Sequence, residues 1–429
     1  MERKYKDSGI EWIGKIPETW EVSQLSNLFK EHSKRNIGIQ ENNLLSLSYG
    51  SIIRKDINDN GGLLPESFEG YNIIEKDDIV FRLTDLQNDK RSLRTGLVKE
   101  RGIITSAYVT VRKRNYKNSS SYFHYLFHSC DECKIFYGLG AGVRQGMNFQ
   151  ELKKLGIVVP PLSEQQRIAD YLDKKCGEID SLIALQEQMI EKLKAYKQSV
   201  ITEAVTKGLD PNAKLVPSGI DWIGDIPEGV KFVKLSMLTS KIGSGSTPRG
   251  GSSIYVKEGI KFLRSQNVYC EGFDLSDVAY ITEDIDEEMS GTRVKVGDVL
   301  LNITGGSIGR CYYVDETLGR ANVNQHVSII RPTKIETKYL KYYLQSDCGQ
   351  KQIALLQTGG NREGLSAAAL SQFSIVYPPL SEQQAIASYL DSKCADIDHL
   401  IAVKQQKIEK LKDYKKSVIY EAVTGKTII

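Results

Sequence analysis

The sequence predicts an α+β protein. We expect two mixed α/β domains separated by two long helices that form an antiparallel coiled coil, with a pseudo-twofold internal duplication. Three observations predict this class: a long helical segment occurs twice, the stretches before its two copies differ, and both stretches hold short apolar runs typical of strands. The chain has 429 residues, 40% hydrophobic and 26% charged, as in globular proteins of several domains.

The repeat begins at Pro160 with PPLSEQQRIADYLDKKCGEIDSL and returns at Pro378 with PPLSEQQAIASYLDSKCADIDHL, and about 34 of 47 positions are identical. A second pair precedes each half, SGIEWIGKIPETW from Ser8 and SGIDWIGDIPEGV from Ser218. We therefore expect a conserved segment over 1–20, a first variable domain over 21–159, a central helix over 160–208, a linker over 209–230, a second variable domain over 231–377 and a C-terminal helix over 378–429.

Each repeated segment is expected to be helical. Ser163 and Ser381 precede Glu-Gln-Gln and are the expected N-caps, a break or bend is expected at Gly177 and Ala395, and Gly208 ends the first copy. The apolar stripe after the bend would give helices of about 28 residues, or about 42 Å. Matching stripes favour antiparallel pairing, which would bring the C-terminal segment near the first SGIEWIG segment. The alternative is that each helix packs only on its own domain.

The two variable segments differ in sequence, but both predict a mixed α/β domain with polar loops. In the first, strand-like runs such as IVFRL and YVTVRKR precede a helix over 122–137 and the loop GLGAGVRQG. In the second, runs such as VLLNIT and VSIIRP precede a helix over 338–355 and the loop TGGNREG. Apart from the glycine-flanked loops at 142–146 and 360–364, we find little similarity between them.

Side chains suited to reading DNA bases gather in particular loops of both segments. Arginine bonds guanine, Asn or Gln bonds adenine, and Asp accepts from cytosine. In the first segment the candidates are Arg82, Asp85, Gln87, Asn88, Lys90, Arg91, Arg94, Arg144 and Gln145, within a basic strip over 82–117. In the second they are Thr247, Arg249, Arg264, Gln266, Asn267, Arg310, Asn361 and Arg362. The alternative is that these loops are solvated turns. The acidic run from Glu283 is expected to face solvent.

Several function classes are disfavoured. A net charge of +3 excludes a histone-like, wholly electrostatic nucleic-acid binder. His124, His128, Cys130 and Cys133 have zinc-ligand chemistry, but one predicted helix cannot easily place all four around an ion, so we expect no metal site. We find no catalytic constellation. Seven scattered cysteines are expected to be free thiols, and without an apolar leader or membrane-length apolar run the chain is expected to be cytoplasmic.

The duplicated PPLSEQQ segment and the paired SGI(E/D)WIG segments resemble the specificity subunits of type I restriction–modification systems, over essentially the whole chain. The resemblance implies two target recognition domains that each read one half of a split site on double-stranded DNA. It implies helices that space these domains and dock two methyltransferase subunits, which methylate adenine N6 with S-adenosylmethionine. It also implies restriction subunits that use ATP and Mg²⁺, and no catalysis or bound cofactor in this chain.

The resemblance also bears on single residues. Asn361 and Arg362 match the family's usual loop near the end of such a domain, whereas Arg144 and Gln145 stand in a loop that departs from it. Two other function classes stay open on residues alone. One is a stand-alone endonuclease, which would cleave DNA as the purified chain. The other is a coiled-coil protein that binds DNA without sequence preference, which would show steep salt dependence and no preference among sequences.

Overall fold

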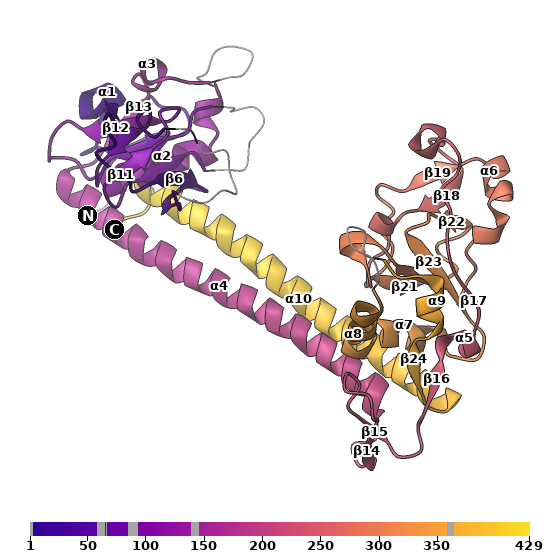
Figure 1. The fold of residues 1–429 in the computed structure, drawn as a ribbon. Helices are drawn as coiled ribbons and strands as arrows, with labels where there is room; N and C mark the ends of the chain where they lie inside the picture. The colour runs from indigo at the N-terminus through magenta and orange to yellow at the C-terminus, as the bar shows by residue number, and fades with distance from the viewer. Residues whose placement is uncertain (1–2, 58–64, 66, 85–92, 139–145, 358–363) are drawn as a thin grey trace. The chain divides into compact units, whose positions relative to one another are not determined.

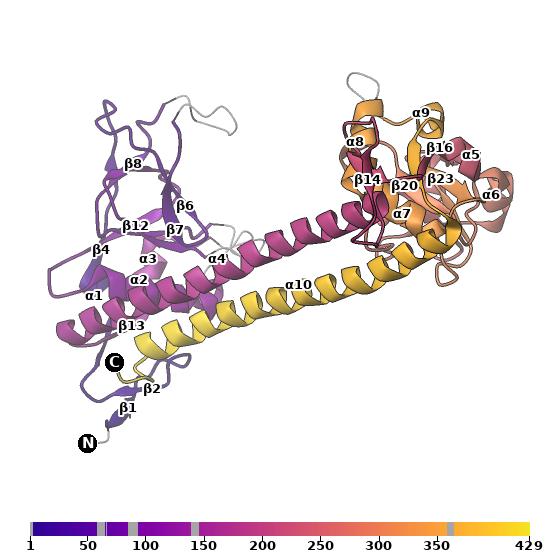
Figure 2. The ribbon, with the colours of Figure 1, turned by 90° about the horizontal axis from the view of Figure 1, so that it is seen from below.

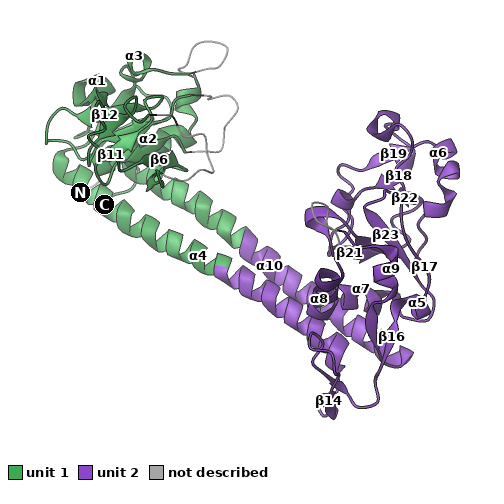
Figure 3. Ribbon diagram, viewed as in Figure 1, with its two compact units in different colours: residues 1–187, 406–429 green, residues 188–405 purple. Residues whose placement is uncertain are grey.

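The computed structural model describes residues 3–57, 65, 67–84, 93–138, 146–357 and 364–429 (Figure 1). The chain divides into two compact units, residues 1–187 with 406–429, and residues 188–405 (Figure 3). Each unit holds one variable domain and one segment of each of two long helices, α4 (Leu162–Lys207) and α10 (Leu380–Val423). In the described ranges, no helix combines the length and apolarity needed to cross a lipid bilayer.

The first unit is built on a four-stranded antiparallel sheet in the order β10-β9-β12-β4 and a three-stranded sheet in the order β11-β8-β5. Three two-stranded pairs, β1–β2, β3–β13 and β6–β7, complete its strands. The strands are β1 (Tyr5–Asp7), β2 (Lys15–Pro17), β3 (Glu21–Gln24), β4 (Phe29–Glu31), β5 (Lys34–Arg35), β6 (Leu45–Ser48), β7 (Ser51–Arg54), β8 (Asn72–Ile74), β9 (Ile79–Phe81), β10 (Thr95–Leu97), β11 (Gly102–Ile104), β12 (Val109–Lys113) and β13 (Gly156–Val159). The helices are α1 (Leu25–Leu28), α2 (Ser120–Glu132), η1 (Ile135–Gly138) and α3 (Phe149–Leu152).

The second unit has a four-stranded sheet in the order β17-β23-β20-β21, a three-stranded sheet in the order β19-β18-β22, and the pairs β14–β15 and β16–β24. The strands are β14 (Leu215–Pro217), β15 (Asp225–Pro227), β16 (Lys231–Lys234), β17 (Thr239–Ser244), β18 (Ile260–Leu263), β19 (Ala279–Ile281), β20 (Val299–Asn302), β21 (Cys311–Tyr313), β22 (Ala321–Val323), β23 (Val327–Pro332) and β24 (Ser374–Tyr377). The helices are α5 (Leu235–Leu238), η2 (Gly251–Ile254), η3 (Ser265–Asn267), α6 (Glu283–Glu288), η4 (Ser290–Thr292), η5 (Gly305–Ser307), α7 (Thr337–Gln345), α8 (Asp347–Leu356) and α9 (Ala367–Ser371).

The two variable domains share their main sheet, although the sequence showed little similarity between them. The strand orders of the four-stranded sheets correspond, and in both sheets a buried aspartate before one central strand binds an arginine near the end of its neighbour. Asp78 accepts two bonds of 2.7 Å from Arg112, and Asp298 accepts bonds of 2.7 and 2.8 Å from Arg331. Such bidentate pairs fix both partners, because breaking one leaves a buried charge.

The predicted α/β character of both domains is confirmed, but the predicted helix over 338–355 is two helices. Ser346 ends α7 and caps α8, since its hydroxyl accepts from the Gly349 amide at 3.2 Å. A serine side chain of this kind satisfies an amide that has no partner within the helix.

The long helices differ from expectation at their starts and their centres. Each begins at the leucine before the expected serine cap, and the carbonyls of Pro161 and Pro379 accept from the amides of Gln165 and Gln383 at 2.9 and 3.0 Å. The expected break is wrong, because α4 runs unbroken through Gly177 and α10 runs unbroken through Ala395. The helices therefore have 46 and 44 residues rather than about 28. Gly208, at φ 74°, ends α4 as predicted.

Within each unit, the segments of α4 and α10 pair antiparallel. In the first unit Lys415 bonds Asp180 at 2.7 Å, and in the second Lys197 bonds Asp398 at 2.8 Å. These partly exposed ion pairs contribute about 1 kcal/mol at most, so buried apolar residues supply most of the stabilisation. In the first unit these residues are Ile168, Leu172, Cys176, Ile419 and Ala422, and in the second Ile201, Val205, Ile386, Leu390 and Cys394.

The C-terminal segment lies against the first SGIEWIG segment, as predicted (Figure 2). The Tyr420 hydroxyl donates to the Trp12 carbonyl at 2.9 Å, and Lys426 donates to the carbonyls of Ile13 and Lys15 at 2.7 and 2.8 Å. The second helix is thereby anchored to the start of the chain.

Each domain also attaches to the long helices through two tyrosines, one helical turn apart on α2 and on α7. One hydroxyl of each pair bonds a carbonyl near the end of a long helix, and the other bonds a helix aspartate. The contacts are Tyr122 to the Val423 carbonyl at 3.0 Å, Tyr125 to Asp173 at 2.8 Å, Tyr339 to the Val205 carbonyl at 3.1 Å and Tyr342 to Asp391 at 2.7 Å. Both domains are thus fixed to the repeated frame by the same chemistry.

Candidate nucleic-acid interface

Loops that are distant in sequence lie together at one end of the main sheet in the second unit. β17 and β20 end at this edge, and β23 begins there, because each lies antiparallel to its neighbour in the sheet. The loops 245–250, 303–310 and 324–326 therefore meet. Close approach requires Gly245, since a Cβ at this position would lie 2.0 Å from the Val323 carbonyl oxygen. We call this set of loops, with 264–268, the loop edge of the second domain.

A chain of polar side chains crosses this loop edge. The Thr247 hydroxyl contacts the Gln325 amide, the Gln325 amide contacts Nε2 of His326 at 3.1 Å, and the Thr304 hydroxyl contacts Nδ1 of His326 at 2.7 Å. These groups both donate and accept hydrogen bonds, as base edges in the major groove require. Sequence reasoning missed Gln325 and His326. The signal was available, because the pair interrupts an apolar strand-like run.

Loop 264–268 joins the same edge through Asn302, whose side chain donates to the Ser265 carbonyl at 2.7 Å. Arg264 and Gln266 both bind Asp277, with an Arg264 Nη2–Oδ2 distance of 3.3 Å and a Gln266 Nε2–Oδ2 distance of 2.7 Å. Asp277 was not predicted, yet its exposed carboxylate holds two predicted readers. Any base contact by Arg264 must therefore compete with this ion pair.

The other described candidates of the second unit fall into three environments. Arg310 stacks on Tyr269, 4.9 Å from the ring centroid. Arg249 is exposed on loop 245–250. Asn267 is buried, where its side chain accepts from the Arg264 amide at 2.9 Å and donates to the Asp274 carbonyl at 2.9 Å. Asn267 therefore shapes its loop, and this placement speaks against direct base contact.

The first unit has the corresponding loop edge at the end of β9. The Met147 amide donates to the Leu83 carbonyl at 2.9 Å, and the Leu365 amide donates to the Ile303 carbonyl at the same distance in the second unit. The candidates Asp85, Gln87, Asn88, Lys90, Arg91, Arg144, Gln145, Asn361 and Arg362 lie outside the described residues. The described chain on either side of 85–92 and 139–145 belongs to this edge.

Arg94 is wholly buried, which contradicts its predicted contact with DNA. Its guanidinium donates to the Thr84 carbonyl at 2.8 Å and to the Tyr137 hydroxyl at 3.2 Å, and its amide donates to the Asp131 carboxylate at 2.7 Å. Burial raises the pKa of Asp131 to about 6. Arg82, whose amide bonds the Arg94 carbonyl at 2.8 Å, is half-buried at the same edge. Arg94 thus holds the base of the loop.

Three cations of the basic strip expected over 82–117 form ion pairs within the domain. Arg112 pairs with Asp78, Lys113 pairs with Asp77 at 3.2 Å, and Arg101 lies 2.9 Å from Glu41. Paired cations attract phosphate less than free ones, so these three contribute less to a phosphate-facing strip, and the strip itself stays a prediction.

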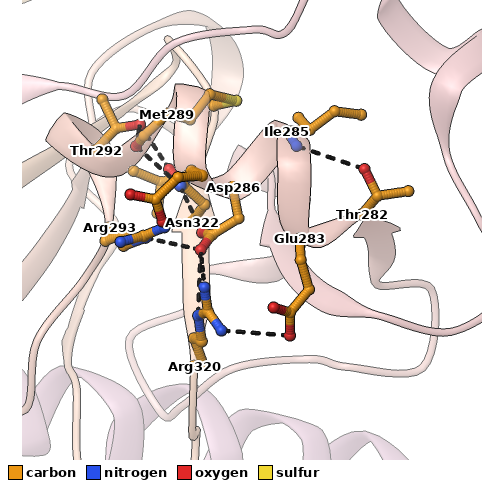
Figure 4. A network of polar contacts seen from close by, with 11 residues as sticks. Thr282, Glu283, Ile285, Asp286, Met289, Thr292, Arg293, Arg320 and Asn322 are labelled. Atoms are coloured by element: carbon orange, nitrogen blue, oxygen red, sulfur yellow. Dashed lines mark hydrogen bonds and ion pairs between the residues drawn. The ribbon is translucent and has the colours of Figure 1, made fainter.

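The acidic run from Glu283 does not face solvent throughout, as expected, because Asp286 is buried (Figure 4). Its carboxylate accepts from Arg293 at 2.7 Å, from Arg320 at 2.7 Å and from Asn322 at 3.0 Å. Burial opposes ionisation of Asp286, but these hydrogen bonds outweigh it and lower its pKa. Asp286 therefore links helix α6 to strand β22 and to the chain segments that carry Arg293 and Arg320.

The four residues with zinc-ligand chemistry share one helix and its C-cap, as predicted. The rings of His124 and His128 lie 4.1 Å apart between centroids, and burial together with the neighbouring His128 lowers the pKa of His124 well below its ordinary value. Cys130 is buried and Cys133 is exposed. The described residues include no group of three or more potential ligands placed to hold a metal ion.

Comparison with known proteins finds the same family twice in the chain. A family model described as the Type I restriction modification DNA specificity domain matches residues 17–195 and 227–413. Over 420 residues the chain is 26% identical to the Type I restriction enzyme MjaVIII specificity subunit of Methanocaldococcus jannaschii, covering 96% of this chain and 94% of that protein.

Solved structures share the fold. One chain, from a study of complex assembly and conformational transition of the type I R-M system, superposes with a TM-score of 0.70 at 16% identity, covering 96% of this chain and 99% of its own. The HsdS subunit from Thermoanaerobacter tengcongensis gives 0.50 at 16% identity, with 96% and 98% covered. At such identity the likeness concerns the fold.

Proposed function

The chain belongs to the specificity subunits of type I restriction–modification systems, the non-catalytic DNA-recognition components, and we propose that its two domains each read one half of a split DNA site. The observation that carries this proposal is the loop edge, which lies at the same end of the corresponding sheet in both domains, while the sequences of the two sets of loops differ. A constant scaffold with different readers suits an asymmetric, bipartite sequence.

In this proposal, the loop edges enter the major groove while lysines and arginines contact phosphates. Thr247, Gln325 and His326 read bases of one half-site, joined by Arg264, Gln266, Arg310 and the predicted Asn361 and Arg362. The bases of the other half-site are read by Arg82 and by the predicted Asp85, Gln87, Asn88, Lys90, Arg91, Arg144 and Gln145. Replacing Arg91 or Arg362 should relax specificity in one half-site only.

Selection from a randomised DNA duplex library by the complex that contains this chain tests the proposal. We expect enrichment of two short sequences separated by a gap of fixed length. A single uninterrupted motif, or no motif at all, would contradict it. Purified chain alone should neither cleave nor methylate DNA.

We also propose that two methyltransferase subunits dock on the long helices. After the first turns of the helices, three apolar positions of the repeat are exposed to a similar extent in both copies. They are Leu182 and Leu400 (44% and 47% exposed), Leu185 and Val403, and Tyr196 and Tyr414. Contact with solvent does not explain why apolar side chains stand at the same positions in both copies. A partner that binds once to each copy does explain it.

Leu182→Glu should remove one methyltransferase subunit from the complex, Leu400→Glu the other, and the double variant both, as native mass spectrometry would show. Met237→Glu is the matched control, because Met237 is an exposed apolar residue on α5 rather than on either long helix. Full occupancy in the double variant would refute this docking surface. In the same proposal, the partner subunits bind S-adenosylmethionine, ATP and Mg²⁺, restriction subunits join them, and the complex acts on cytoplasmic DNA.

A further inference from the structure

A buried cluster in the first unit ties the start of the chain to α4. Trp20 is fully buried, and its indole N–H donates to the Glu164 carboxylate at 2.9 Å. The Arg3 guanidinium bonds the same carboxylate and lies 5.7 Å from the centroid of the Trp20 ring. The Trp20 ring also meets Tyr122 edge to face, at 6.4 Å between centroids. One carboxylate is thus held by an indole and a cation.

The second unit keeps the carboxylate of this cluster but loses both of its partners. Glu382 corresponds to Glu164 in the PPLSEQQ repeat, whereas Val230 takes the place of Trp20 and Ala213 that of Arg3 in the second repeat. Within the described ranges, the Glu382 carboxylate has no hydrogen bond or ion pair. The second unit therefore has the carboxylate of this cluster without its indole and without its cation.

A cavity of about 500 Å³ opens at this position in the second unit, within the size range of ligand pockets. Both replaced positions line it, with Glu382, Pro227 and Pro379. Four other charged side chains line the cavity, and three of them have partners of their own: Lys207 lies 3.5 Å from Glu203, Glu228 accepts from Lys214 at 2.8 Å, and Asp210 accepts from the Asn212 amide at 2.9 Å. The fourth, Lys231, is exposed to solvent.

We propose that this cavity binds a basic and aromatic side-chain pair of a partner protein, an indole N–H beside a guanidinium. The indole would donate to Glu382 and lie where Trp20 lies in the first unit, and the guanidinium would pair with the same carboxylate. Charge-assisted hydrogen bonds and a buried aromatic anchor are the contacts that dominate protein interfaces. The cavity is separate from the loop edge, so this interaction is additional to DNA reading.

The amidated dipeptide Arg-Trp, titrated into the full chain and followed by saturation-transfer NMR, is the probe. We expect a dissociation constant of about a millimolar, weakened at least about tenfold by Glu382→Gln. Val230→Trp should abolish binding by filling the cavity. A dipeptide methylated at the indole nitrogen should bind several-fold more weakly. Glu258→Gln, an exposed acid elsewhere in the same unit, is the control and should bind normally.

No binding to the unchanged chain, or equal binding to Glu382→Gln, would overturn the proposal. If circular dichroism shows that Val230→Trp has lost helical content, that variant is set aside, and the proposal is tested by Glu382→Gln and by the methylated dipeptide. DNA binding measured alongside should be unchanged in Glu382→Gln. Failure of this proposal is therefore distinguishable from failure of DNA recognition.

Discussion

Arg94 and Arg310 occupy equivalent positions before β10 and β21, and each stacks on a tyrosine. The centroid distances are 5.5 Å to Tyr137 and 4.9 Å to Tyr269. Arg94 is buried because the folded loop offers it carbonyl acceptors, whereas Arg310 keeps some exposure. An arginine before a strand looks the same in both sequences. The types of residue in the sequence therefore indicated where the loop edges lie. They could not show which arginine faces solvent, because that depends on carbonyl acceptors brought together only in the folded chain.

Asp131 should make stability depend on pH in a direction opposite to that of most acids. Its folded pKa is about 6, raised by burial from 3.8, so the folded state binds its proton more tightly than the unfolded state. Stability from this group is complete below about pH 4 and is lost as pH rises through 6, by about 3 kcal/mol at most. Asp131→Asn should remove this loss while still accepting from the Arg94 amide.

Urea midpoints of the unchanged chain and of Asp131→Asn, measured from pH 4 to pH 7, check this. As pH rises, the urea midpoint of Asp131→Asn should rise steadily relative to that of the unchanged chain. A constant difference between the two would show that Asp131 keeps an ordinary pKa in the fold.

At the scale of elements, periodicity predicted the central strands of both main sheets and the two long helices, because alternation and the 3.6-residue repeat report directly on burial. Periodicity did not predict that α7 and α8 are separate helices, because the break between them depends on a single cap residue, Ser346. It also failed to show that the two domains share one sheet. The two domains share only a few widely spaced residues, among them the buried Asp–Arg pairs and the paired tyrosines. The apolar residues of the two cores differ, because cores tolerate exchange of one apolar residue for another. A search for widely spaced Asp, Arg and Tyr positions would have found the second duplication.

Gly177 gives an element-scale prediction with an internal control. It is exposed within continuous helix, and a Cβ there would meet nothing within 4 Å. Gly177→Ala should therefore raise the free energy of unfolding by about 0.5–1 kcal/mol, measured by urea denaturation. Ala395 is its counterpart in α10, and Ala395→Gly should lower the free energy by a similar amount. Destabilisation by Gly177→Ala would mean that a bend exists there after all.

At the scale of the molecule, duplication accounts for the length and for the near-neutral charge. Two domains and two helices use nearly all 429 residues, and many cations of the first domain pair internally, as Arg101, Arg112 and Lys113 do. A chain of net charge +3 has little non-specific attraction for DNA. Specific contacts at the loop edges, made in company with partner subunits, must then carry recognition.

The most direct test of this account is the pattern of N6-methyladenine in cells that express the chain with its partner subunits. Sequencing should reveal one bipartite motif that disappears without the chain. The triple variant Thr247→Ala, Gln325→Ala, His326→Ala should relax one half of that motif and leave the other half unchanged. A change in both halves, or an unaltered motif, would contradict the assignment of one half-site to each domain.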